Sequence, residues 1–443
     1  MLQKTLSTIF IVLFAIALLG VLLTSTIDRS DYKTKAYYLE TISKLQDLKP
    51  DSSEGDSWLV GWSKINATPA EPANLVGYAP RGNYDFVLDS SFVRALVIGN
   101  GMQNVAILNY ELLIVHPYLA DRIKQRIENE NLPIDFIYFT ATHTHSGIGG
   151  YIPGLMGKVA FGGYDESIVN MLEQKTLEGL QNALESQDSA SVSFQVSLTD
   201  SLVYNRFVHE DPVDPYIRQL VFRKSTGEKA TFLTYSAHPT TLAVKFMGLS
   251  GDYPHYLMDK FETGLYDFAL FAAGTVGSQG PSRTGNQPEH TKAFAEAVFQ
   301  QAISNVEEEE TVDRKKIGFT RLPVALREAQ YRLGKNIRLQ PWVFESAFGE
   351  SNAHFDAVLI GNTLLISSSG EVSGTFMQDW EKLAKSRGLN LMVTTFNGGY
   401  IGYITPDAYY DYEYHEVRSM NWYGPYNGTY FIELVNGLIG KDW

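Results

Sequence analysis

Short apolar runs alternate with longer amphipathic stretches along the chain from about Trp58 onward. Short apolar runs bounded by turn residues are typical of buried strands, and apolar positions that recur roughly every three or four residues are typical of helices. The pattern predicts strands at 95–98, 105–110, 134–142, 192–196, 219–222, 231–236, 357–360, 363–368 and 391–395. It predicts helices at 117–130, 166–185, 254–265, 291–307 and 372–387. Alternation of this kind favours an α/β fold, here with mixed sheets and flanking helices.

The N-terminal segment differs from the rest of the chain. Residues 6–23 (LSTIFIVLFAIALLGVLL) are apolar except for Ser7 and Thr8, and they follow Lys4. The run is about long enough to cross a bilayer and is apolar on all faces, unlike an amphipathic core helix. A cleaved signal peptide is the alternative, although no clear small-x-small cleavage site follows the run. We expect an uncleaved transmembrane signal anchor over residues 1–27, with the bulk of the chain outside the cytoplasm, or secreted if the segment is cleaved.

The remaining chain divides into two parts by composition. Residues 28–56 are polar and charged, with a possible short helix at 37–48, and are expected to form a stalk. Residues 57–443 are expected to form one large domain, and two lobes divided near residue 315 are the alternative. The acidic run 307–310 is expected to end a helix as a solvated segment.

Composition and charge exclude several classes of function. The chain has 443 residues, no cysteine and a formal net charge of -14. Without cysteine there are no disulfides, zinc–thiolate sites, iron–sulfur clusters or thiol catalysis. The negative charge would repel a phosphate backbone and no basic patch offsets it, so nucleic-acid binding is disfavoured. Nothing in the composition indicates an oligomeric state.

The most informative segment is 134–151 (IDFIYFTATHTHSGIGGY), in which an apolar run leads into His143 and His145 and then a glycine-rich turn. On an extended chain, residues i and i+2 point to the same side, so both imidazoles can enter one pocket. Two histidines at this spacing are good ligands for zinc or a similar metal. Two surface histidines at a strand end are the alternative, and the spacing alone does not decide between them.

Three further apolar runs end shortly before a possible metal ligand. In order along the chain, these ligands are His238, Glu371 and Tyr403. In open α/β sheets, ligands gather at the carboxyl ends of the strands. With His143 they would supply two imidazoles, a carboxylate and a phenol oxygen, a set that suits zinc and leaves access for water. Taken singly, a hydrogen-bonded histidine, a carboxylate in the first turn of a helix and a core tyrosine are the alternatives.

Other chemistry is less well supported by the residues. Arg206 is a candidate oxygen-binding group because its guanidinium is a fixed fork of donors, and a surface salt bridge is the alternative. Ser278 lies in a small, glycine-rich segment, but no G-x-S-x-G elbow surrounds it, which disfavours a serine hydrolase. The sequence contains neither a P-loop nor a dinucleotide-binding glycine fingerprint.

These segments resemble the catalytic domain of the neutral/alkaline, non-lysosomal ceramidases. The resemblance runs in order from about residue 58 to 430, and His143 and His145 lie in its most specific motif. The matching segments are 61–69 (GWSKINATP), 75–79 (LVGYA), 141–147 (ATHTHSG) with 149–150 (GG), 205–206 (NR), 237–239 (AHP), 250–253 (SGDY), 370–371 (GE), 402–405 (GYIT) and 423–425 (YGP). This collinear order is more specific than any single motif.

The resemblance implies a zinc amidase that hydrolyses the N-acyl bond of ceramide to sphingosine and fatty acid with metal-activated water. Carried over by motif, the zinc ligands are His143, His238, Glu371 and Tyr403. His145 and Arg206 would flank the water and the amide, and a tyrosine would assist at the oxyanion. The spacing leaves Tyr414 and Tyr412 open for that role, with Tyr414 preferred. A membrane anchor suits a lipid substrate such as ceramide or a related N-acyl lipid.

The sequence also departs from the family pattern. Residues 277–281 (GSQGP) replace a Gly-Asp-Val-Ser-Pro-Asn loop, and Glu111 replaces a strand-end aspartate. The chain ends 20 residues after Tyr423, so the C-terminal immunoglobulin-like domain of full-length ceramidases is expected to be absent. Two alternatives therefore stay open. The first is a zinc hydrolase of the same fold that acts on another N-acyl or ester substrate, and the second is a non-catalytic surface binding protein.

Overall fold

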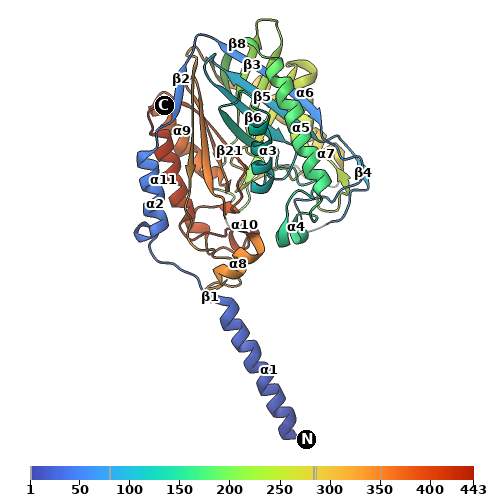
Figure 1. Cartoon of the computed structure of the whole chain (residues 1–443), viewed down its shortest axis with the longest axis vertical. Coiled ribbons are helices and arrows are strands. Elements are labelled where there is room, and N and C mark those ends of the chain that lie inside the picture. Colours follow the sequence, from blue (N-terminus) through green and yellow to red (C-terminus); the bar gives the residue numbers. More distant parts are fainter. Residues whose placement is uncertain (1, 79–80, 283–284, 286, 350) are drawn as a thin grey trace.

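Two mixed β-sheets pack face to face, and helices cover the outer face of each sheet (Figure 1). The computed structural model describes residues 2–78, 81–282, 285, 287–349 and 351–443. Ala79 of the 75–79 motif lies outside the described residues. The two sheets share one apolar core and form a single mixed α/β domain, which is the fold class that the sequence predicts.

The larger sheet has nine strands, in the order β13-β11-β10-β8-β3-β5-β6-β7 with β15 paired to β8. Pairs β6/β7 and β11/β13 are parallel and the other pairs are antiparallel. The strands are β3 (Trp58–Asn66), β5 (Phe92–Gly99), β6 (Asn104–Tyr110), β7 (Phe136–Ala141), β8 (Asp188–Leu198), β10 (Tyr216–Lys224), β11 (Lys229–Tyr235), β13 (Phe268–Ala273) and β15 (Val306–Thr311).

The smaller sheet has five strands in the order β2-β16-β18-β19-β21. These are β2 (Asp51–Glu54), β16 (Lys316–Pro323), β18 (His354–Ile360), β19 (Thr363–Ser368) and β21 (Asn390–Thr395). Along β5, Leu96 and Ile98 face the second sheet while Val97 faces the helices. Because both faces of such a strand are buried, its sequence is a continuous apolar run instead of an alternating one.

The helices form the two outer layers (Figure 1). The nine-stranded sheet is covered by α3 (Pro117–Asn129), α5 (Glu166–Glu185), α6 (Asp252–Gly264) and α7 (Pro288–Ser304), and the five-stranded sheet by α2 (Ala36–Asp47), α9 (Met377–Ser386) and α11 (Asn427–Ile439). Three short helices are α4 (Gly154–Ala160), α8 (Pro341–Phe348) and α10 (His415–Arg418). The 3₁₀ turns are η1 (Tyr32–Thr34), η2 (Gly374–Phe376) and η3 (Asp407–Tyr409).

The remaining strands are short pairs outside the two sheets. They are β1 (Thr24–Thr26) with β17 (Ile337–Leu339), β4 (Phe86–Val87) with β12 (Gly248–Leu249), β9 (Val203–Asn205) with β14 (Gln279–Pro281), and β20 (Glu371–Val372) with β22 (Tyr403–Ile404). The last two pairs lie beside the candidate site and hold several of its residues.

The nine predicted strands and five predicted helices all have counterparts, and two helices need correction. The helix predicted at 291–307 ends at Ser304. The acidic run 307–310 belongs instead to strand β15. This strand pairs with β8 along the part of its edge that β3 does not occupy. The helix predicted at 372–387 begins at Met377, because Glu371 and Val372 pair with β22. Both errors arise where backbone pairing, which side-chain periodicity does not reveal, determines the structure.

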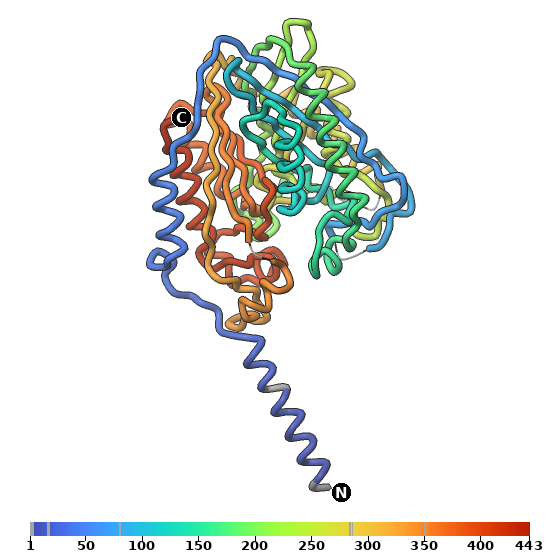
Figure 2. Tube along the Cα trace, viewed as in Figure 1, coloured from blue at the N-terminus to red at the C-terminus, as the bar shows by residue number. Residues whose placement is uncertain are grey.

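Residues 28–56, expected to form a stalk, pack on the domain instead. Helix α2 buries Thr41 and Leu45, Tyr32 packs into the same core as α11, and β2 adds a strand to the smaller sheet. Helix α1 (Leu2–Leu23) projects from the domain without covering any part of it (Figure 2). Its segment Lys4–Leu23 is the single helix in the described residues that is long and apolar enough to cross a membrane.

Candidate metal centre

His143 and His145 lie just beyond the carboxyl end of β7, and both rings point to one centre. The Nε2 atoms of the two residues are 3.4 Å apart. His143 has a left-handed backbone with φ of 63°, and its ring stacks on Phe396 with centroids 4.2 Å apart. The predicted convergence of the two imidazoles is therefore present, but a strained turn produces it instead of an extended chain.

His238, which follows β11, brings a third imidazole to the same centre. Its Nε2 lies 3.1 Å from Nε2 of His143 and 2.9 Å from Nε2 of His145. His143 donates through Nδ1 to the carbonyl of Leu113 at 2.7 Å, and His238 donates through Nδ1 to the carbonyl of Val276 at 3.2 Å. In the neutral rings, these bonds leave the Nε2 atoms as acceptors that face one another.

The curvature of the larger sheet explains why these loops meet. Strands β7 and β13 lie at its two ends, yet Asn109 on β6 donates to the carbonyl of Phe271 on β13 at 2.7 Å. Thr395, which ends β21 of the smaller sheet, donates to the carbonyl of Ala273 at 3.3 Å. The carboxyl ends of strands from both sheets therefore gather in one place.

Glu371 and Tyr403 lie in the short β20/β22 pair, in segments that follow strands of the smaller sheet. They are direct neighbours across the parallel β20/β22 pair, and both are buried. Glu371 Oε2 lies 3.4 Å from Nε2 of His143 and accepts no hydrogen bond within the described chain. The hydroxyl of Tyr400 donates to Glu371 Oε1 at 2.7 Å. Tyr400 has no distinguishing spacing in the sequence, which is why its contact with the site was not predicted.

A divalent metal such as zinc fits this donor set. Imidazole nitrogens that bind one zinc at about 2.0–2.1 Å lie about 3.3 Å from each other in a tetrahedral arrangement. The three distances between the Nε2 atoms, 2.9, 3.1 and 3.4 Å, are close to that value. Lone pairs that face each other at this separation repel unless a ring proton or a metal cation lies between them, and the orphaned Glu371 Oε2 would supply a negative ligand.

The local electrostatics favour the neutral forms of His145 and His238 and the charged form of Glu371. Burial, Arg206 and the neighbouring histidines lower the pKa of His238 well below its ordinary value. Burial, His143 and Arg206 do the same to the pKa of His145. Burial raises the pKa of Glu371, but His143 and the nearby tyrosine hydroxyls outweigh it and hold the pKa below its usual value. Neutral imidazole and ionised carboxylate are the forms that bind metals.

Arg206 lies against the same group of residues. Its guanidinium donates to the carbonyl of Gly277 at 3.2 Å and pairs with Glu416 at 3.0 Å, and its Nη2 lies 3.4 Å from Nδ1 of His238. The predicted alternative of a surface salt bridge is wrong in its location, because the Arg206 side chain is 19% exposed and borders the centre. Glu416 had no sequence signal as its partner.

The 277–281 segment, which departs from the family pattern, has a structural role here. Ser278 is buried, and it accepts hydrogen bonds from the backbone of Gly374 at 3.1 Å and from the hydroxyl of Ser373 at 2.8 Å. Its carbonyl accepts the backbone N–H of Arg206 at 2.8 Å. The segment thereby joins Arg206 to the chain that follows Glu371, and Ser278 is not an exposed nucleophile.

Replacing Gly277 by alanine is expected to disturb this junction. An added Cβ would lie 2.3 Å from the carbonyl oxygen of Glu371 and 2.8 Å from the carbonyl carbon of Val372, and both are backbone atoms. Overpacking of this kind costs about 1–3 kcal/mol. Thermal unfolding should show a lower Tm for Gly277→Ala. Gly264→Ala is the control, because an added Cβ there meets nothing within 4 Å, and an equal Tm for both variants would contradict the prediction.

Tyr414 and Tyr412 lie at the surface beside the centre. Tyr414 is 45% exposed, and its ring lies 5.7 Å from that of Phe207, the residue after Arg206. Tyr412 is 39% exposed and packs on Tyr409 and Tyr414. Both line an open depression together with residues 207–210. The structure thus brings the two tyrosines near Arg206, but no described contact joins either of them to the three imidazoles.

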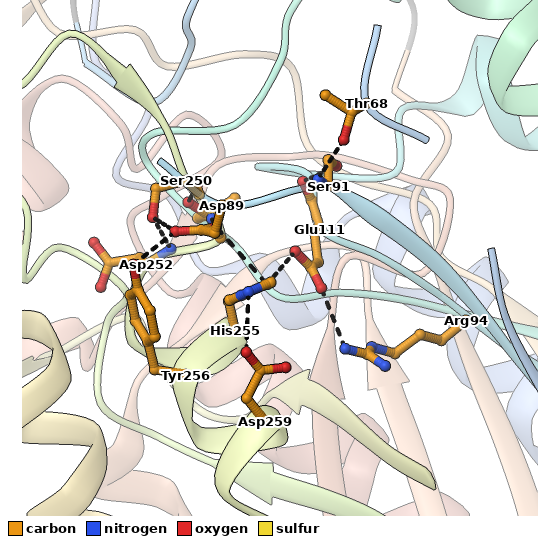
Figure 3. A network of polar contacts seen from close by, with 12 residues as sticks. Thr68, Asp89, Ser91, Arg94, Glu111, Ser250, Asp252, His255, Tyr256 and Asp259 are labelled. Carbon is orange, nitrogen blue, oxygen red and sulfur yellow. Dashed lines mark hydrogen bonds and ion pairs between the residues drawn. The ribbon is translucent and has the colours of Figure 1, made fainter. Parts of the chain in front are cut away.

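Asp89, Glu111 and His255 form a second cluster of possible metal ligands (Figure 3). His255 Nδ1 is 3.1 Å from Glu111 Oε2 and 3.7 Å from Asp89 Oδ1, and its Nε2 is 3.4 Å from Asp259 Oδ2. Arg94 Nη2 lies 3.5 Å from Glu111 Oε1. Cationic side chains therefore occupy the positions next to the carboxylates, which makes the cluster a network of ion pairs.

This network supports the loops around the candidate metal centre. Asp89 accepts hydrogen bonds from the Ser250 hydroxyl at 2.7 Å and the Gly251 backbone at 2.6 Å. The carbonyl of Ser250 in turn accepts the hydroxyl of Thr144 at 2.7 Å, between the two histidines of the loop. The segment that begins at Glu111 supplies the carbonyls that bind His143.

Replacing His255 by glutamine is expected to destabilise the chain most at low pH. Burial alone would lower the pKa of His255, but Glu111, Asp259 and Asp89 outweigh it and raise the pKa from 6.5 to about 10. Protonated His255 therefore stabilises the folded state fully below about pH 6.5, and this contribution is lost as the pH rises toward 10. Because one pKa unit corresponds to about 1.4 kcal/mol, the full effect amounts to several kcal/mol.

Urea unfolding of the full chain in detergent, at about pH 6 and about pH 9.5, measures this difference. The gap between wild type and His255→Gln should be large at the lower pH and small at the higher one. His290→Gln, at an exposed histidine near the start of α7, is the control and should leave stability unchanged at both. A gap for His255→Gln that does not change with pH would contradict the assigned charge.

Residues 58–267 match the family model described as neutral/alkaline non-lysosomal ceramidase, N-terminal. This match confirms the resemblance predicted from the sequence. None of the curated proteins matches the chain significantly.

Two solved structures share the fold. The crystal structure of neutral ceramidase from Pseudomonas aeruginosa matches with a TM-score of 0.71 at 16% sequence identity, over 87% of this chain and 75% of that chain. A ceramidase complexed with C2 matches with a TM-score of 0.70 at 16% identity, over 86% of this chain and 75% of that chain. The fold shared with these structures agrees with the family match.

Proposed function

We propose that this chain, whose residues 58–267 match the N-terminal ceramidase family model, is a zinc-dependent amidase that hydrolyses the N-acyl bond of ceramide to sphingosine and a fatty acid. One observation carries the proposal. Three imidazole Nε2 atoms, from the buried His143 and His238 and the half-buried His145, lie 2.9 to 3.4 Å apart, next to a Glu371 oxygen that accepts no hydrogen bond within the described chain. Such a set of donors suits a metal cation.

The zinc ligands in this proposal are His143, His238, Glu371 and Tyr403. Bound zinc lowers the pKa of water and polarises a carbonyl, which an amide requires because it is a poor electrophile. The carbonyls of Leu113 and Val276 orient the two imidazoles by accepting their Nδ1 protons, as second-layer groups do in metal sites.

The neighbouring residues handle protons and charge. Neutral His145 can accept a proton from the attacking water and return it to the nitrogen of the departing amine. Arg206 is always charged and stabilises the negative charge that develops on the carbonyl oxygen. Tyr414 is proposed to assist at the same oxygen. Because this side chain is exposed, it would have to approach the centre when substrate binds.

A second candidate is a hydrolase of the same fold that acts on another N-acyl or ester substrate. The observation that favours it is the 277–281 segment, which departs from the family pattern next to Arg206. A panel of N-acyl lipids, N-acyl amino acids and esters separates the two candidates, since the first requires ceramide to be turned over.

We further propose that helix α1 anchors the chain in a membrane, with the catalytic domain on the extracytoplasmic side. The support is the length and hydropathy of Lys4–Leu23 and its lack of burial against the domain. This arrangement would hold the site close to a lipid substrate.

The test of the amidase is ceramide hydrolysis by the full chain in detergent micelles, with and without a zinc chelator. We expect release of fatty acid, loss of release with the chelator, and recovery when zinc is returned. Elemental analysis should find one zinc per chain. A folded chain that holds zinc but releases no fatty acid would favour the second candidate, or a binding role, over the ceramide amidase. A folded chain that holds no zinc would refute the mechanism.

A further inference from the structure

The point where α1 joins the domain is tied by hydrogen bonds instead of a flexible linker. The backbone N–H of Gln340 donates to the carbonyl of Leu23 at 2.9 Å, and its side chain donates to the carbonyl of Thr24 at 3.1 Å. Strand β1 pairs antiparallel with β17, and Arg338 on β17 donates to the Ser25 hydroxyl at 3.0 Å. We use the name collar for three parts of the chain taken together. They are strand β1, strand β17 with the turn 331–336 that precedes it, and helix α8.

The collar carries large apolar side chains that face solvent. Leu333 is 45% exposed, Ile337 is 50% exposed and Trp342 is 56% exposed. Leu333 and Ile337 are joined by a backbone hydrogen bond of 2.9 Å, and Trp342 lies in the first turn of α8, directly after β17. Apolar side chains grouped in this way mark an interaction surface.

The geometry points to a lipid bilayer as the partner of this surface. We propose that Leu333, Ile337 and Trp342 of the collar lie in the interfacial layer of the membrane that α1 crosses. Lys4–Leu23 has about the length of a membrane span, so its end at Leu23 would reach the membrane surface. Because the collar is bonded to that same residue, it is held against the interface, where tryptophan is preferred. Lys335, exposed in the turn between Leu333 and Ile337, suits anionic head groups.

This surface also leads toward the candidate metal centre. Arg332, in the collar turn, donates to the carbonyl of Tyr412 at 2.9 Å. Tyr412 and Tyr414 line the open depression beside Phe207, next to Arg206. A lipid that leaves the bilayer at the collar would therefore meet this depression first. The passage of a lipid from the collar to this depression rests on the proposed amidase function. The contact between the collar and the membrane rests on α1 and the collar alone.

The experiment measures tryptophan fluorescence of the full chain in vesicles of phosphatidylcholine and phosphatidylglycerol. Part of the phosphatidylcholine carries bromine on its acyl chains near the head group, where it quenches tryptophans at the interface. The contribution of Trp342 is the difference between wild type and Trp342→Phe, a conservative change at an exposed position. The matched control is Trp443→Phe, at the C-terminus, which lies far from α1 (Figures 1 and 2).

We expect the Trp342 contribution to be quenched by the brominated lipid and the Trp443 contribution to be unaffected. A Trp342 contribution that the brominated lipid does not quench would overturn the proposal. A second result would also overturn the proposal. In that result, the Trp342 emission is protected from aqueous iodide, is not quenched by bromine and depends on protein concentration. The collar would then contact a second copy of the chain instead of the bilayer. No substrate is used, so a failure of the amidase assay does not alter this result.

Discussion

Replacing His143 by alanine is expected to abolish zinc binding and ceramide hydrolysis together. His143 Nε2 lies 3.1 Å from Nε2 of His238 and 3.4 Å from Glu371 Oε2, so its loss removes the ligand that joins the imidazoles to the carboxylate. Removing one of the four proposed ligands would leave a site that binds zinc poorly, and in the proposed mechanism amide hydrolysis depends on the metal. We expect activity to fall to the detection limit.

Zinc content by elemental analysis and fatty-acid release by the full chain in detergent measure the two effects. His290→Ala, at an exposed histidine, is the control and should retain both zinc and activity. Circular dichroism establishes that each variant is folded. A folded His143→Ala chain with full activity would exclude the proposed mechanism, and one that keeps its zinc but loses activity would remove His143 from the ligand set.

Replacing His145 by alanine is expected to separate zinc binding from turnover. In the proposed mechanism His145 carries a proton and is not needed to hold the metal, so the variant should keep one zinc per chain. Loss of a positioned acid–base group lowers kcat by about 10²–10⁴-fold. The rate of the variant should also lose the pH dependence that a titrating imidazole gives.

The structure makes this variant informative, because His145 Nε2 lies only 2.9 Å from Nε2 of His238. Either role, a proton carrier or a third imidazole ligand of the metal, is compatible with a side chain at this position. Zinc content decides between them. If His145→Ala loses zinc to the same extent as His143→Ala, His145 belongs to the ligands and the proton carrier has to be sought elsewhere.

Much of the fold was predictable from the sequence because the inner strands of both sheets are buried on both faces. Apolar runs such as 105–110 and 363–368 therefore mark the strands β6 and β19 nearly to the residue. The errors fall where side-chain pattern and backbone pairing diverge. Strand β15 is exposed along its whole length and carries four glutamates, so no apolar alternation distinguishes it from a solvated helix end.

The candidate site was predictable in its residues but not in its geometry. The motifs identified His143, His145, His238 and Glu371, which the structure does bring together. Their meeting depends on the curvature of a nine-stranded sheet and on the β20/β22 pair, and neither leaves a local signal in the sequence. Tyr400 is a partly buried tyrosine, and only its contact with Glu371 distinguishes it from the other tyrosines that pack on the core.

The two sheets divide the proposed ligands between them, and this has a consequence for folding. His143 and His238 extend from the larger sheet, while Glu371 and Tyr403 follow the smaller sheet, more than a hundred residues later in the chain. A folding intermediate whose second sheet has not yet docked would possess the imidazoles of the larger sheet but no anionic ligand, so its affinity for zinc would be weaker than that of the complete site. Tight metal uptake would therefore mark the last stage of maturation, and the time course of zinc incorporation after refolding would report when the two halves of the molecule join.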